Sequence, residues 1–205
     1  NGCMAEDWTS INVAEDFNPG YIRNVSFYGD IYLGVFEKNV EVSKGFQKHS
    51  GIRNATICNA SVGDNCLIEN IGNYIHNYSI GDNCHISNVK TIETMEGATF
   101  GQGNMVSVLN EVGDGNVILF DGLTSQLAAL MVNHINDKEM ISIIKTLVRK
   151  EIDDNLPDHG TIGDGVKIIN TGEITNTHIS DECEINGACR LSDCTIKGIP
   201  QAGVY

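Results

Sequence analysis

Lys48, His49 and Arg53, in the stretch KHSGIRN, are three side chains that could do chemistry together. A histidine can accept a proton from an attacking hydroxyl or amine, and basic neighbours can bind an anionic group. Basic residues are scarce in this chain, which has 13 Lys and Arg against 27 Asp and Glu. The same residues could also decorate an exposed loop, and both interpretations stay open.

Two further positions carry candidate side chains. His134 lies on the apolar face of a predicted helix, and Asn110 and Glu111 occur in VLNEVGDG, where a regular pattern of repeats fades. We therefore predict His49, His134 and Glu111 as catalytic candidates and Lys48, Arg53 and Asn110 as substrate-binding candidates. The alternative is that His134 is a packed core residue and that Asn110 and Glu111 are an ordinary polar boundary.

The phrase GDNC occurs twice, at Gly63–Cys66 and at Gly81–Cys84. A metal or phosphate loop would need several such phrases to converge, whereas Gly, Asp and Asn already suit a tight turn. The seven cysteines form no CxxC pair and show no zinc-site spacing, so we predict no metal site. We expect reduced thiols in a cytoplasmic protein and an architectural role for GDNC.

An internal repeat in the sequence predicts the elements that position these residues. The length of the repeat equals the spacing between the two GDNC phrases. Ile57 and Ile75 are separated by that same spacing, and so are Ile68 and Ile86. Near the C-terminus, aliphatic residues recur every five or six positions, and Ile162 matches Ile179 at a spacing one position shorter. The aliphatic residues of that run are Ile162, Ile168, Ile174, Ile179, Ile185, Leu191 and Ile196.

This spacing predicts triangular coils whose short strands stack in parallel, with the aliphatic side chains inside. Small residues are expected at the inner corners of the coils, and these include Cys66, Cys84, Cys183 and Cys189.

The repeats are interrupted by a stretch with helical periodicity. Apolar residues three and four apart predict a helix over Ser125–Asn136. A second helix is expected after Asn136-Asp137, with Glu139 in the capping-box position, and it ends before Pro157. Its apolar face comprises Met140, Ile143, Ile144, Leu147, Val148 and Ile152. Both helices must bury their apolar faces on the coils or on a neighbouring subunit.

The hexads VGDNCL, IGDNCH, IGDGVK, ISDECE and INGACR resemble those of the hexapeptide-repeat family, over about residues 52–92 and 162–197. Weaker hexads lie at Val25–Ile31 and Phe100–Val106. The resemblance implies an all-β fold, a left-handed parallel β-helix with a two-helix insertion. The corresponding division is an N-terminal arm (1–21), a first part of the β-helix (22–110), the helical insertion (111–160), a second part (161–199) and a tail (200–205).

Segments such as KHSGIRNAT and FGQGNMVSVLNEVG resemble a bacterial family labelled as related to UDP-N-acetylglucosamine pyrophosphorylase. The Gly-rich nucleotidyltransferase signature of that enzyme is missing from this sequence. The resemblance to the hexapeptide-repeat family, which is dominated by acyltransferases, implies an acyltransferase-like protein acting on a nucleotide sugar or related small substrate. The alternative is a non-catalytic β-helix that serves as an oligomerisation or ligand-binding module of a longer protein.

Charge and hydropathy limit the partners. A formal charge of −14 works against binding a nucleic-acid backbone, so no nucleic-acid partner is expected. No apolar run reaches the roughly 18 residues of a membrane span, so no part of the chain is expected to lie in a membrane. The family resemblance implies a homotrimer, no bound cofactor and acyl-CoA as a possible co-substrate.

Overall fold

The computed structural model describes residues 1–107, 116–134 and 136–198, and this part of the chain is mostly β structure. The chain divides into two compact units. The first combines residues 1–98 with the chain from residue 159 onward, and the second is Thr99–Asp158.

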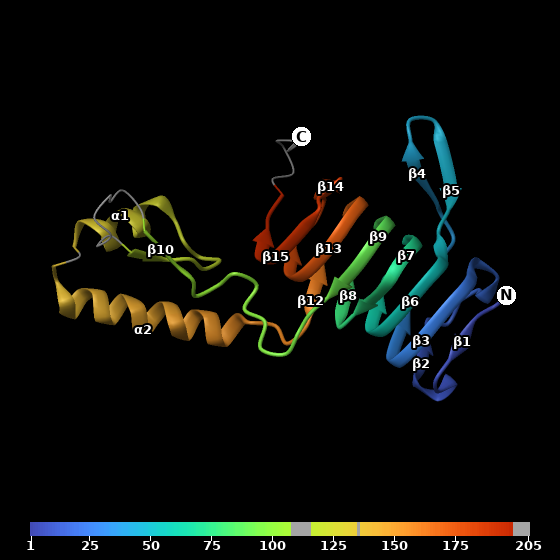
Figure 1. Cartoon of the computed structure of the whole chain (residues 1–205), viewed down its shortest axis with the longest axis horizontal. Coiled ribbons are helices and arrows are strands. Elements are labelled where there is room, and N and C mark those ends of the chain that lie inside the picture. Colours follow the sequence, from blue (N-terminus) through green and yellow to red (C-terminus); the bar gives the residue numbers. More distant parts are fainter. Residues whose placement is uncertain (108–115, 135, 199–205) are drawn as a thin grey trace. The chain divides into compact units, whose positions relative to one another are not determined.

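The first unit contains almost all of the strands (Figure 1). In chain order they are β1 (Met4–Ala5), β2 (Ile11–Val13), β3 (Ile22–Leu33), β4 (Asn39–Ser43), β5 (Phe46–His49), β6 (Gly51–Val62), β7 (Leu67–His76), β8 (Tyr78–Ile80), β9 (His85–Glu93), β12 (Gly160–Ile162), β13 (Lys167–Ile179), β14 (Glu184–Asn186) and β15 (Arg190–Ile196). Short 3-10 turns lie at Trp8–Ser10 and Pro19–Tyr21.

The strands of the main sheet pair in parallel, and their order closes on itself through β6, β7, β9, β13, β12 and β8. The closure arises because each long strand bends at corners, so its two ends belong to different sides of a coil. β6, for example, pairs with β7 near Ile52 and again at Ile57, and then with β8 at Val62. The chain therefore winds in coils that stack on one another through parallel strands.

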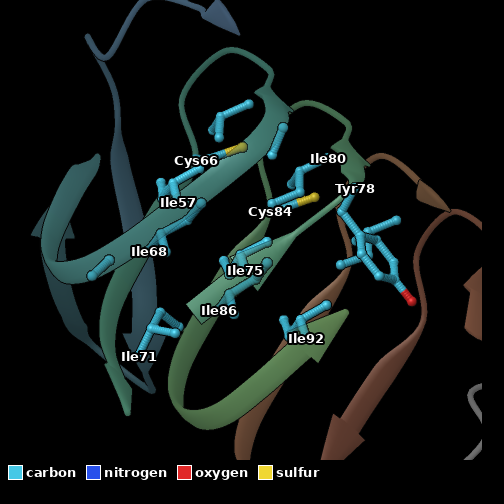
Figure 2. Packing of buried hydrophobic residues seen from close by; sticks show 14 of the residues in the cluster. Ile57, Cys66, Ile68, Ile71, Ile75, Tyr78, Ile80, Cys84, Ile86 and Ile92 are labelled. Atoms are coloured by element: carbon cyan, nitrogen blue, oxygen red, sulfur yellow. The ribbon is translucent and has the colours of Figure 1, made fainter. Parts of the chain in front are cut away.

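Three columns of inward aliphatic residues run through the stacked coils. The first column is Ile22, Ile52, Ile68, Ile86, Ile168 and Ile185; the second is Phe27, Ile57, Ile75, Ile92, Ile174 and Leu191; the third is Leu33, Val62, Ile80, Ile162, Ile179 and Ile196. The predicted pairings of Ile57 with Ile75, of Ile68 with Ile86 and of Ile162 with Ile179 are confirmed. Most of these side chains are completely buried, and Figure 2 shows those of the middle coils stacked on one another.

Asparagines form the corner between the first and second columns. Asn24, Asn54, Asn70, Asn88 and Asn170 all have left-handed backbone angles, with φ between 52° and 57°. Along the row, the side-chain amide of each asparagine before Asn170 donates to the side-chain carbonyl oxygen of the next, at 2.9–3.1 Å. Asparagine tolerates this conformation better than other residues with a side chain. The recurrence of Asn in this sequence is therefore structural.

The GDNC phrases form the corner between the third and first columns. The carboxylate of Asp82 accepts a hydrogen bond from the Asp64 N–H, and Asp164 and Asp181 repeat the arrangement in later coils. A Cβ at Gly63 would collide with the Asp82 carboxylate, which explains the glycine. The buried Cys66 and Cys84 thiols donate to the carbonyl oxygens of the next coil at 3.0 Å. GDNC is thus a structural corner. The prediction that Cys189 also lies at an inner corner was wrong, because Cys189 is exposed.

The segment predicted as an N-terminal arm contributes paired strands. Ala5 of β1 pairs with Phe27, and Ile11 and Val13 of β2 pair with Ile31 and Leu33. Because both pairings are parallel and lie on the far side of β3 from β6, residues 1–21 add a partial layer to the stack.

The second unit contains β10 (Met105–Ser107), β11 (Asn116–Ile118), α1 (Ser125–Asn133) and α2 (Lys138–Asn155). β10 and β11 pair antiparallel, so the weak hexad predicted at Phe100–Val106 is not a further coil. Thr124 caps α1, which ends three residues before the predicted boundary. Asp137 caps α2 by accepting from the Met140 N–H, which places Glu139 one position short of the capping box.

The two units have separate cores. That of the second unit consists of Val117, Ile118, Met131, Val148 and Ile152, all buried. None of the described helices is long and apolar enough to cross a membrane.

Candidate functional site

A β-hairpin brings two of the predicted site residues onto the outer side of the first column. β4 and β5 pair antiparallel, with Val40 opposite Lys48, and form an insertion between Leu33 of the third column and Ile52 of the first. The Asn65 side chain accepts from the N–H groups of Glu37 and Lys38 at 3.0 Å, which anchors the start of the hairpin. Sequence reasoning expected only a loop here.

His49 is held in one orientation. Its ring stacks on the ring of Tyr21, with centroids 3.9 Å apart and planes inclined by 13°. Its Nδ1 lies 2.9 Å from the Ser50 carbonyl oxygen, which can only accept. Nδ1 must therefore carry the proton, and in the neutral ring Nε2 holds the free lone pair. This is the tautomer that a general base needs.

Glu69 binds the two basic residues beside His49. Its Oε1 is 2.8 Å from Lys48 Nζ, and its Oε2 is 3.9 Å from Arg53 Nη1. Arg53 also donates through Nη2 to the His49 carbonyl oxygen at 2.9 Å. The structure therefore brings Lys48, His49 and Arg53 together, around a carboxylate that sequence reasoning did not single out. Two cations meet one carboxylate, which leaves a local positive charge in an acidic protein.

The register of the strands places Glu69 in this cluster. Arg53, Glu69 and Ser87 are successive partners on β6, β7 and β9, and they alternate with inward isoleucines. Glu69 and Ser87 are nonetheless buried, and Ser87 Oγ donates weakly to Glu69 Oε1 at 3.4 Å. Arg53 Nη1 is also buried and has no hydrogen-bond partner among the described residues. A small polar group, such as a water molecule, could bridge Arg53 Nη1 and Glu69 Oε2.

His85 is the least expected member of the cluster. It lies between Leu67 and Lys167 in register, is 4% exposed, and neither ring nitrogen has a hydrogen-bond partner among the described residues. Burial, followed by the charge of Lys167, lowers the pKa of His85, so the ring is held neutral. A buried polar group left unpaired is uncommon in native proteins and calls for an explanation, such as an ordered water molecule or a functional role.

Sequence reasoning missed Glu69, Ser87 and His85, although one signal pointed to the first two. The coil repeat places Glu69 and Ser87 in one outward column, and Arg53 joins this column from the preceding coil. A charged residue in that column beside Arg53 could have been read from the alignment of the hexads. The repeat could not show that Glu69 and Ser87 are buried, because they belong to an outward-facing column.

The other predicted site residues lie elsewhere. His134 is the exposed C-cap of α1 in the second unit, where its N–H donates to the Leu130 carbonyl oxygen. Asn110 and Glu111 lie outside the described residues. Within the described part of the chain, no group of three or more His, Cys, Asp or Glu side chains is placed to hold a metal ion.

The fold and the cluster define a class of protein: stacked parallel β coils with a β-hairpin and an α/β insertion, and a basic, histidine-containing cluster on one side. The chain belongs to the family described as a domain of unknown function, DUF4954, whose model matches residues 1–205. It is 25% identical over 207 residues to an uncharacterised protein of Treponema pallidum (strain Nichols). That match covers 96% of this chain and only 28% of the relative. No solved structure matches the chain.

Proposed function

We propose that the chain is an acyltransferase-like protein of the hexapeptide-repeat kind, built on a left-handed parallel β-helix and acting on a nucleotide sugar or related small substrate. The observation that carries the proposal is the fixed tautomer of His49 beside two basic residues. In this proposal His49 is the general base, and Lys48 and Arg53 hold an anionic group of the substrate. The protein works in the cytoplasm, as a homotrimer.

The chemistry required of His49 is a single proton transfer. Nε2 takes the proton of an acceptor hydroxyl or amine while the acceptor atom attacks the thioester carbonyl of acyl-CoA. The carbon–sulfur bond breaks, and the proton passes to the departing CoA thiolate, giving the acylated product and free CoA. A positioned base of this kind contributes about 10²–10⁴ in rate. Stacking on Tyr21 keeps the ring from rotating away during the transfer.

The test combines binding and turnover. Acetyl-CoA and UDP- or dTDP-sugars are added singly in a thermal-shift assay, because a ligand that binds only the folded state raises the apparent melting temperature. Acetyl transfer is then followed by mass spectrometry of the sugar. His49→Gln should lower kcat at least a hundredfold and leave the acetyl-CoA shift intact. His76→Gln, on the outer side of the second column, is the matched control. Full transfer by His49→Gln would end the assignment.

A second function rests on a different observation. Glu69 already pairs with both Lys48 and Arg53 and neutralises half of their charge from within the chain, as expected of a structural cluster. The chain also spans about 28% of the length of the Treponema relative. The alternative is therefore a non-catalytic β-helix that serves as an oligomerisation or ligand-binding module of a longer protein. Absence of any thermal shift with acyl-CoA, together with a stable oligomer, would favour it.

A further inference from the structure

Part of the apolar face of α2 has no partner among the described residues of the second unit. Of the six apolar residues expected on this helix face, only Val148 and Ile152 are buried in the unit's own core. Ile143 and Leu147, one turn apart, are 55% and 62% exposed. These two side chains form an apolar patch on one helix face, and contiguous apolar patches that extend beyond a few residues mark interaction sites.

A hollow lies beside this pair. It has a volume of about 400 Å³ and is lined by Phe120, Leu127, Ile144, Val148 and one side of Leu147, with Glu151 among the polar atoms. An apolar side chain from a second molecule would fill it and remove both surfaces from water. Leu147 belongs both to the exposed pair and to the lining of the hollow, so the pair and the hollow adjoin on one surface.

Two opposite charges flank the exposed pair. Glu139 lies four residues before Ile143 and Lys150 lies three residues after Leu147, and both are exposed. At about 3.6 residues per turn, the angular positions of Glu139 and Lys150 around the helix axis differ by about 20°. Both therefore lie on the same side of the apolar stripe formed by Ile143 and Leu147. Neither forms an ion pair among the described residues.

We infer that this face, defined by Glu139, Ile143, Leu147 and Lys150, binds the same face of a second copy of the chain, with the two α2 helices antiparallel. The two copies are related by a twofold axis perpendicular to both helices, at the level of Lys145. This axis places the N-terminal end of the Ile143–Leu147 stripe of one copy opposite the C-terminal end of the stripe of the other. Residues on one side of the stripe face residues on the same side in the second copy. Glu139 of one copy then faces Lys150 of the other, and the pair forms twice. A parallel arrangement would instead leave Glu139 and Lys150 at different heights, so that this charge pair could not form.

The same axis brings the apolar groups into contact. Ile143 of each copy lies opposite Leu147 of the other, so the exposed aliphatic pairs of the two copies are removed from water together. Side chains three and four apart lie on one helix face, which allows both aliphatic residues to engage at once. The charge pairs lie at the two ends of the contact, where they determine orientation more than affinity. The inference concerns the second unit alone and does not depend on the proposed acyl transfer.

The experiment is a charge exchange in the full chain, with mass measured by sedimentation equilibrium over a range of protein concentrations. Glu139→Lys and Lys150→Glu should each weaken association at least tenfold by placing like charges together. The double variant, which has the same net charge as the wild type, should restore it. Arg149→Glu is the control, because it makes the same charge change on an exposed residue that points away from the stripe.

Each outcome bears on the inference. Rescue by the double variant supports the antiparallel pair, and Leu147→Glu should abolish the pairing through α2, which halves the mass of the assembly, while circular dichroism shows the helices intact. A wild-type chain that stays monomeric at about 100 micromolar, a concentration at which even weak specific association is measurable, would overturn it. So would an oligomer indifferent to Lys150→Glu, because the contact would then lie elsewhere.

Discussion

Asp82 accepts a hydrogen bond of 2.7 Å from the main-chain N–H of Asp64, although the two residues are 18 positions apart. The contact repeats from Asp82 to Asp164 and from Asp164 to Asp181, so each carboxylate ties its own coil to the preceding one. The row sets like charges next to one another, and the hydrogen bonds to main-chain amides offset that repulsion. The short phrase GDNC therefore records how one coil is joined to the next.

This row predicts opposite effects for two changes at Asp82. Asp82→Asn keeps an oxygen that can accept from the Asp64 N–H and removes a repelling charge, so stability should be unchanged or slightly higher. Asp82→Ala loses the acceptor and should cost about 0.5–1.5 kcal/mol. Urea unfolding of the two variants checks this. Equal destabilisation by both would show that the charge itself is required.

Tyr78 forms hydrogen bonds close to the point where the chain leaves the coils for the insertion. Its buried hydroxyl donates to the Thr177 carbonyl oxygen at 2.7 Å and accepts from the Thr177 N–H at 3.1 Å. Tyr78→Phe leaves both main-chain groups unpaired and should cost about 1–3 kcal/mol in urea unfolding. Tyr32→Phe, a largely exposed tyrosine, is the control and should cost little.

Tyr78 also predicts a loss of stability in alkali. Burial raises the pKa of Tyr78 to about 12, above the ordinary value near 10. The folded state thus holds this proton more tightly than the unfolded state, and stability falls as the pH rises from about 10 toward 12. In Tyr78→Phe this part of the pH dependence should disappear. A wild-type curve that is flat over this range would contradict the burial of an unionised phenol.

His85 predicts a loss of stability in acid. Burial and the charge of Lys167 lower the pKa of His85, with a smaller contribution from Lys48 and an opposing one from Glu69. Below about pH 6.5 the unfolded chain therefore binds a proton that the folded chain does not, and stability falls as the pH falls. His85→Leu removes the titration, so its advantage over the wild type should grow between pH 7 and pH 5. A constant difference would mean that the ring is solvated or paired.

The two ends of the insertion predict that it can be removed. The N–H of Thr94 bonds to the His76 carbonyl oxygen and the N–H of Gly160 to that of Asn77, so the chain leaves and returns at neighbouring points. Since the cores are separate, replacing Thr99–Asp158 by a short Gly-Ser linker should leave the coils folded. Far-ultraviolet circular dichroism should show the helical signal lost and a cooperative β transition retained. An unfolded product would show that the coils depend on the insertion.

Local pattern determined most of the coil architecture in advance. An inward isoleucine such as Ile68 is specified by a period that depends only on coil circumference, and its partner Ile86 follows by counting. The helices over α1 and α2 were likewise predictable, because amphipathic spacing and an Asp cap act within one element. The boundaries were less certain, since helix ends depend on how the following residues are capped.

The candidate site was predicted in part and for a local reason. Lys48, His49 and Arg53 are close in sequence, so their proximity needed no knowledge of the fold. Glu69 and His85 entered only through the register of three strands, and their burial depends on what covers the outer side of the first column. No pattern of hexads carries that information, because outward positions of a coil are solvent-exposed by default.

The sequence alone thus determined the repeat, its circumference and the position of the helical interruption, because each depends on residues a few positions apart. Tertiary structure decided which outward side chains are buried, that the hairpin β4–β5 carries His49 to Tyr21, and that α2 leaves Ile143 and Leu147 open. These outcomes depend on packing between segments distant along the chain. Their energies are set by surfaces that meet only after folding.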